Sequence, residues 1–196
     1  MTFSSELEGW LESDSPKSLG AMTHVFAEKS FAVTIMMLLL VSATPVPTGG
    51  VMLLVQLVAV VVAAQMVIGR QDLWIPKKWG HRELGPRWTT KFIPLLIRLV
   101  RRFERHSHPR WASLYDRRWF TRILGLAMLV FAVVSALAPP LTGLDTLPAL
   151  GAVVIALSIV LEDIVVFAVG MVIGSGGVVL FVAVGAAVIR AVGDWF

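Results

Sequence analysis

Two stretches of this chain interrupt an apolar run in the same way. In residues 42–49 the run stops at Ser-Ala, passes through prolines to Thr-Gly and then resumes, and residues 135–143 repeat this order. Proline removes a backbone donor and glycine permits a positive φ, so each stretch is expected to end one helix and start the next. The predicted turn residues are Pro45, Pro47 and Gly49 in the first copy and Pro139, Pro140 and Gly143 in the second. The sequence therefore predicts two repeated hydrophobic hairpins, and it leaves open whether they run parallel or inverted.

The composition indicates that these hairpins lie in a membrane. Of the 196 residues, 57% are hydrophobic and only 15% are charged, and the mean hydropathy is +0.80. These values lie outside the usual range of soluble domains. The length suffices for one small helical bundle, so we predict an all-α, polytopic integral membrane protein with a single membrane domain. The chain has no cysteine, which excludes disulfides, thiolate metal sites and a cysteine nucleophile.

The chain divides into five predicted regions. Residues 1–17 form an acidic tail without the basic start of a secretory signal. The first membrane hairpin follows in 18–69, a basic loop in 70–118, the second hairpin in 119–163 and a final apolar segment in 164–196.

Two of these regions allow more than one course through the membrane. Glu28 and Lys29 interrupt the first apolar segment, so the first hairpin is expected either to cross with a tilt or to be re-entrant. The last run is broken only by glycines at 174–177, which allows one long span or two half-length helices. The side of the C-terminus depends on that choice.

The central loop carries most of the positive charge of the chain. By the positive-inside rule it is expected to be cytoplasmic. Its middle places Phe92, Leu96 and Phe103 on one helical face and Arg98 and Arg102 largely on the other, which predicts a basic amphipathic helix at the membrane surface. Anionic headgroups are its expected partners. Nucleic-acid binding is not expected, because tryptophans beside a membrane segment are more typical of an anchor. The expected interfacial anchors are Trp74, Trp88 and Trp119.

A few polar side chains near the apolar segments are candidate functional positions: Glu28, Gln65, Arg70, Glu162 and Asp163. An intramembrane carboxylate would suit a proton relay or a cation site, but two adjacent acids between apolar runs more often mark an interfacial turn. Gln65 is expected to bond another helix. Glu28 and Lys29 could form a polar cluster with the basic loop.

Gly170 and Gly174 let helices approach closely, either within the protomer or across a homodimer. No catalytic motif, metal-ligand pattern or cofactor-binding pattern accompanies these features, so we expect neither an enzyme nor a cofactor.

Several short motifs, in order, resemble the ExoD family of bacterial membrane proteins. They are residues 27–31, 45–49, 65–70, 73–77 and 161–163. The chain differs at Ile164, where the resemblance implies a glycine after the acidic pair. The resemblance implies a protein of the bacterial inner membrane that is linked to exopolysaccharide synthesis, without an established reaction.

Two functions remain open at this point. One is a non-enzymatic structural or regulatory membrane factor, a homodimer that contacts lipids or proteins of exopolysaccharide assembly. The other is a small transporter or channel whose broken helices meet near mid-membrane. A shared wet cavity at Gln65 and Glu162 would favour the transporter.

Overall fold

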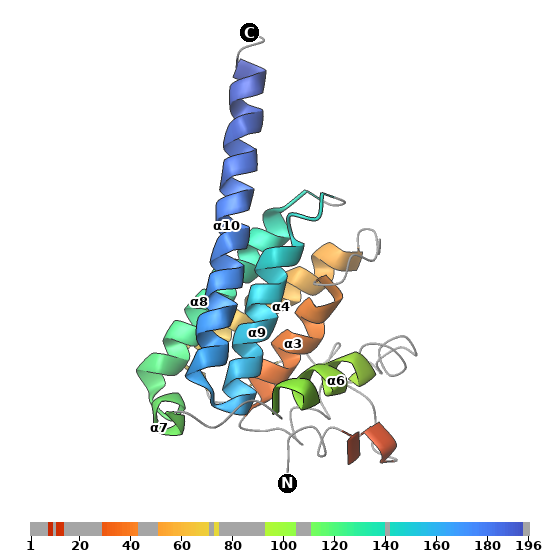
Figure 1. Cartoon of the computed structure of the whole chain (residues 1–196), viewed down its shortest axis with the longest axis vertical. Helices are drawn as coiled ribbons and strands as arrows, with labels where there is room; N and C mark the ends of the chain where they lie inside the picture. The colour runs from red at the N-terminus through yellow and green to blue at the C-terminus, as the bar shows by residue number, and fades with distance from the viewer. Residues whose placement is uncertain are drawn as a thin grey trace.

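The computed structural model describes residues 8–9, 11–13, 29–42, 51–70, 73–74, 93–104, 111–139 and 142–193, and every regular element within them is a helix. Five apolar helices form the bundle: α3 (Ser30–Ser42), α4 (Val51–Ile68), α8 (Arg118–Leu137), α9 (Thr146–Leu161) and α10 (Ile164–Gly193). Figure 1 shows α6 (Ile93–Glu104) and α7 (Ala112–Tyr115) at one end of this bundle, and α10 projecting far beyond the other. The all-α prediction is confirmed.

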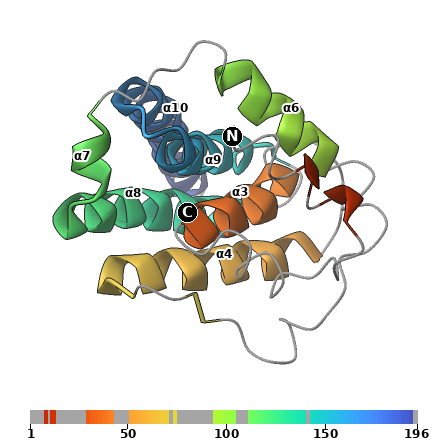
Figure 2. The same ribbon diagram turned by 90° about the horizontal axis from the view of Figure 1, so that it is seen from below.

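The centre of the bundle is α9, which packs against α10, α3 and α8 (Figure 2). Its sequence is apolar on every side, so it has no solvent-facing stripe, and most of its residues are buried. α3 is similarly enclosed, between α9 and α4. A helix that is hydrophobic all round is expected in the interior, and here the two shortest apolar helices occupy it.

The two helix pairs run in the same direction. The start of α3 lies at the end of α9, because Lys29 bonds Glu162, and the start of α4 lies near the end of α8, because Gln56 bonds Ser135. α3 and α8 therefore run towards one end of the bundle, and α4 and α9 return (Figure 1). The pair α3 and α4 is therefore parallel to the pair α8 and α9 in the structure.

The final apolar run is one continuous helix, so the glycines at 174–177 do not divide it. Among the described residues, two helices are long and apolar enough to cross a membrane by length and composition: Arg118–Leu137, with 20 residues, and Ile164–Ala191, with 28. The other apolar helices are shorter. Together they point to a membrane protein.

Gly170 and Gly174 lie inside the protomer, where α10 crosses α9. A Cβ built on Gly170 would lie 2.8 Å from Ile155, and one on Gly174 would lie 2.1 Å from the ring of Phe131. Across the crossing, a Cβ on Gly151 would lie 2.4 Å from the Cα of Gly174. Of the two roles that the sequence allowed, these glycines have the internal one, and placing them at a dimer interface is wrong.

Several residues with a predicted role lie outside the described residues. This holds for Glu28, Trp88 and the turn residues Pro45, Pro47, Gly49 and Pro140. The amphipathic helix is present as α6, with Ile93, Leu96 and Val100 buried and Arg98 and Arg101 exposed. It packs on α3.

Candidate functional site

The acidic pair forms a tight turn between α9 and α10. Glu162 adopts a left-handed backbone with φ of 53°, and the N–H groups of Glu162 and Asp163 both donate to the carbonyl of Ser158. Asp163 is 2% exposed, and its carboxylate accepts from the N–H of Val165 at 2.9 Å, which caps α10. Glycine is the usual residue in a left-handed helix end. Ile164 therefore does not prevent the turn, because Glu162 adopts the unusual φ.

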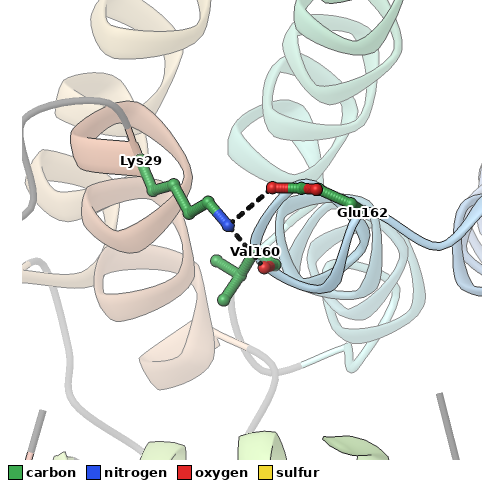
Figure 3. A network of polar contacts seen from close by, with 3 residues as sticks. All are labelled: Lys29, Val160 and Glu162. Atoms are coloured by element: carbon green, nitrogen blue, oxygen red, sulfur yellow. Dashed lines mark hydrogen bonds and ion pairs between the residues drawn. The ribbon is translucent and has the colours of Figure 1, made fainter. Parts of the chain in front are cut away.

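Lys29 holds this turn against the start of α3 (Figure 3). Its Nζ donates to Glu162 Oε1 and to the carbonyl of Val160, both at 2.9 Å. The two charged side chains remain about one-third exposed. A cation near the last carbonyls of α9 also interacts favourably with the helix dipole. The candidate residue Glu162 is thus half of a structural ion pair, and Lys29 is its partner.

Tyr115 approaches the same turn from α7. Burial raises the pKa of its phenol above the ordinary value, and the nearby carboxylates of Asp163 and Glu162 raise it further, whereas the Ser158 hydroxyl opposes the shift. The phenol therefore stays protonated at neutral pH. Its oxygen is buried and has no hydrogen bond of good geometry in the described part of the chain.

An aromatic cluster joins α7, α8 and α10 beside this phenol. The ring of Tyr115 packs edge-on against Phe120 at 5.1 Å between centroids. Phe120 in turn contacts Trp119 at 5.8 Å and Phe167 at 5.7 Å. Trp119 remains about half exposed, as an interfacial residue would be. The residues around the acidic turn thus hold α3, α7, α8, α9 and α10 together at one end of the bundle.

Gln65 closes the end of α4 rather than bonding another helix. Its side-chain amide donates to the carbonyl of Trp74 at 3.1 Å and accepts from the N–H of Trp74 at 2.8 Å. Gly69 has a φ of 83°, and its N–H donates to the carbonyl of Met66, while the N–H of Arg70 donates to the carbonyl of Gln65. These are the two hydrogen bonds of a Schellman motif at a helix C-terminus. The Arg70 side chain is exposed, and so is the Trp74 ring. The prediction of an interhelical bond from Gln65 is therefore wrong.

The interhelical bond that the sequence missed comes from Gln56. Its amide donates to Ser135 Oγ at 3.0 Å, and Ser135 Oγ donates to the carbonyl of Asp145 at 3.2 Å. Both side chains are buried. The signal was available, since Gln56 interrupts an otherwise apolar helix and Ser135 begins a repeated turn. Asp145 stands at the N-cap position of α9 without a side-chain capping bond.

A segment of the acidic tail lies against the basic helix. Glu8 forms an ion pair with Arg101, and Leu11 packs against the core. Glu8, Leu11 and Glu12 line a surface cavity of about 270 Å³ with Pro94, Ile97, Arg98 and Arg101 of α6. Arg98 and Arg101 remain exposed. Two acidic and two basic side chains therefore line the same cavity, and Glu8 pairs with one of the two arginines.

Of the candidate polar residues that the structure describes, three bond within the protein and the Arg70 side chain is exposed. Glu162 pairs with Lys29, Asp163 caps α10, and Gln65 bonds Trp74. Neither Gln65 nor Glu162 lines the cavity on α6. Within the described ranges no three histidine, aspartate or glutamate side chains gather as metal ligands would.

Comparison with known proteins gives the chain a family. A family model described as "Exopolysaccharide synthesis, ExoD" matches residues 3–183, most of the chain. The chain belongs to the ExoD family. It is also 25% identical over 185 residues to an uncharacterized protein, slr1875, of Synechocystis sp., covering 91% of this chain and 86% of that relative. No solved structure matches it. Membership links the chain to exopolysaccharide synthesis.

The motifs that carry the ExoD resemblance have structural roles where the structure describes them. Lys29 forms an ion pair with Glu162, and residues 161–163 connect α9 to α10. Residues 65–70 form the end of α4, where the Gln65 amide donates to the carbonyl of Trp74. They lie at helix ends. The motifs that carry the resemblance therefore lie where the helix ends bond to other parts of the chain.

Proposed function

We propose that this ExoD-family chain is a non-enzymatic integral protein of the bacterial inner membrane that supports exopolysaccharide synthesis as a structural or regulatory factor. One observation carries the proposal. Three polar contacts hold helices or helix ends together: Lys29 bonds Glu162, Gln56 bonds Ser135, and Gln65 bonds the backbone of Trp74. Groups used in this way fasten helices, whereas a relay or a substrate site needs groups that face water or a ligand.

A substitution at Glu162 separates this proposal from a transporter that uses the carboxylate as a proton relay. Glu162→Gln keeps an oxygen that accepts from Lys29 but cannot be ionised. In a strain that lacks the gene, the variant is expected to restore secreted exopolysaccharide as well as the unaltered chain does. A normal amount of protein in the membrane with no polysaccharide restored would instead favour the relay. Lys29→Arg, which keeps the cation, is the matched control on the other side of the pair.

The contacts between helices also support the inferred duplication. If α3 corresponds to α8 and α4 to α9, a twofold rotation should turn the contact of α3 with α9 into the contact of α8 with α4. Both of these contacts are extensive. The proposal keeps a second copy of the chain as a partner. Its interface lies on a face other than the one that contains Gly170 and Gly174.

We infer that the basic loop between the hairpins is cytoplasmic, because Lys and Arg are retained on that side during insertion. The chain has no cysteine, so a single introduced thiol reports on its own position. A thiol at the exposed Ser113, on α7, is expected to escape an impermeant maleimide in spheroplasts and to react once the membrane is opened. Labelling of Ser113→Cys before opening would reverse this orientation.

We infer that the exposed face of α6 binds anionic headgroups, and that Arg98 and Arg101 supply much of the attraction. Each Arg near an anionic surface contributes about 1 kcal/mol, so replacing both should remove about 2 kcal/mol. The unaltered protein is expected to unfold at a higher temperature in phosphatidylglycerol nanodiscs than in phosphatidylcholine nanodiscs. The variant with Arg98→Gln and Arg101→Gln should lose most of that difference.

Arg190→Gln is the matched control, because Arg190 lies in the last turn of α10. Because it removes one cation at the other surface, it should lose no more than about half as much of the difference between the two lipids as the double variant loses. An equal loss from the control would mean that the lipid effect is general rather than located on α6. The Glu8→Gln variant should increase the difference, since Glu8 competes for Arg101.

A further inference from the structure

α10 continues as an apolar helix long after it leaves the bundle (Figure 1). The last of its buried residues among those described is Gly177, where a Cβ would lie 2.6 Å from Pro148 at the start of α9. Residues 178–189 that follow are all apolar. At 1.5 Å per residue, this projecting segment of twelve residues is roughly 18 Å long.

The projecting segment is exposed on every side. Val179 is 67% exposed and Ile189 is 74% exposed, and the large exposed side chains between them are Leu180, Val182, Val184 and Val188. Successive residues of a helix point about 100° apart, so these six do not form one stripe. A protein partner covers a stripe, whereas lipid chains surround a helix. Leaving each of these side chains in water would cost roughly 1.5 kcal/mol or more.

The hairpins end well short of the far end of α10. α3 has 13 residues and α9 has 16, which correspond to roughly 20 Å and 24 Å, against a hydrocarbon core of about 30 Å. α8 has 20 residues, but its Phe131 lies beside Gly174 of α10, so the last six residues of α8 reach only a little beyond the level of Gly177. Measured along α10, Gly177 lies roughly 21 Å from Asp163, whereas Arg190 lies roughly 40 Å away. The polar groups at the two ends of α10 are therefore far enough apart to reach both surfaces, and the hairpins end about halfway between them.

The chemistry of the hairpin tips suits a position away from water. Residues 30–69 contain no charged side chain, and residues 123–161 contain only Asp145. Backbone groups at membrane depth must be satisfied within the protein. In the second tip Pro139 has no N–H, and its carbonyl accepts from Thr142 Oγ1 at 2.7 Å. The N–H of Thr146 bonds Gly143, and Ser135 bonds the carbonyl of Asp145.

We propose that the projecting half of α10 is a binding surface for the acyl chains of one leaflet, and that both hairpins end inside the bilayer, so that α10 alone crosses it. This rests on the membrane location in the proposed function and replaces the polytopic crossings expected from the sequence by half-depth hairpins. The bundle then occupies the leaflet next to the basic loop, and a single helix occupies the other. Such a wedge displaces more lipid from the first leaflet than from the second.

Single thiols test the proposal in the cysteine-free chain. In spheroplasts treated with an impermeant maleimide, Ala191→Cys beyond the apolar segment should be labelled, and Thr142→Cys at the second tip should not. In opened membranes Thr142→Cys should still resist labelling, and it should react after solubilisation in detergent. Labelling of Thr142→Cys in spheroplasts would show that the hairpin crosses fully. If neither Ala191→Cys nor Ser113→Cys reacted from the outside, or if both did, the two ends of α10 would lie on one side and α10 would not cross. Either result overturns the proposal.

A nitroxide at position 142 identifies what surrounds the tip. Lipid-soluble oxygen should relax it strongly and a water-soluble nickel chelate weakly. Strong relaxation by nickel would place the tip in water. Weak relaxation by both would mean that protein, such as a second copy, covers it, and each of these outcomes contradicts the proposal. The Ser113→Cys result is independent, since reversed labelling there changes the side of the loop but not the depth of the hairpins.

Discussion

Replacing Gly151 with leucine is expected to prevent α9 from packing against α10. A Cβ at this position would lie 2.4 Å from the Cα of Gly174 and 2.6 Å from its backbone nitrogen. A flexible side chain can move away from such a clash, but a helix backbone cannot move without its neighbours. Overpacking of this kind costs roughly 3 kcal/mol or more, a large part of the stability of a small protein. We expect loss of cooperative thermal unfolding by circular dichroism in detergent, together with rapid proteolysis.

Gly185→Leu is the matched control on the same helix. A Cβ at Gly185 has nothing within 4 Å, so leucine fits there and favours the helix by nearly 1 kcal/mol. The control should unfold at an unchanged or slightly higher temperature. A Gly151→Leu protein with the same unfolding midpoint as the control would contradict the described crossing of α9 and α10.

The same geometry predicts the outcome of replacing Gly170 and Gly174 together with leucine. Because both face the interior of the protomer, folding should be lost along with any self-association. If the double variant were instead a folded monomer while the unaltered chain is a dimer, these glycines would lie at an interface between two copies.

The sequence predicted the helices well and their contacts poorly. The two predicted turns fall between α3 and α4 and between α8 and α9, because proline, glycine and charge stop an apolar helix. The amphipathic spacing likewise located α6. These signals are local in the chain, so one sequence suffices to read them.

The contacts of individual polar side chains could not be read in this way. Gln65 and Gln56 look alike in sequence, yet Gln65 bonds a backbone nine residues away and Gln56 bonds Ser135 across the bundle. Spacing could not distinguish them, because the choice depends on which helix ends meet. The same applies to Gly170, whose neighbour Ile155 is set by the crossing of α10 over α9.

The left-handed residue at the acidic turn shows a third limit. A glycine at position 164 would have suited a left-handed residue in the turn, but the chain has Ile164 there. Instead Glu162 takes the positive φ, and the bonds to Ser158 and the ion pair with Lys29 hold it there. Tertiary contacts that exceed the cost of about 1 kcal/mol for such a backbone cannot be seen in local sequence.

Lys29→Met is expected to destabilise the fold more than Glu162→Gln does. Methionine keeps much of the length and apolar stem of lysine but leaves the carboxylate of Glu162 and the carbonyl of Val160 without their shared donor. Breaking a fully buried ion pair costs roughly 3–5 kcal/mol, and water reaches about a third of each side chain here, so we expect about 2 kcal/mol. Glu162→Gln keeps an acceptor for Lys29 and should cost under about 1 kcal/mol.

Chemical unfolding in mixed micelles measures both variants, and the double variant completes the cycle. Once Glu162→Gln is present, Lys29→Met should cost less than it does alone, because no charge is left unpaired. The remaining cost comes from the carbonyl of Val160 at the end of α9, which loses the hydrogen bond from Lys29. Equal costs of Lys29→Met in both backgrounds would show that the two side chains act independently, and the ion pair would then not be what fastens α3 to the turn between α9 and α10.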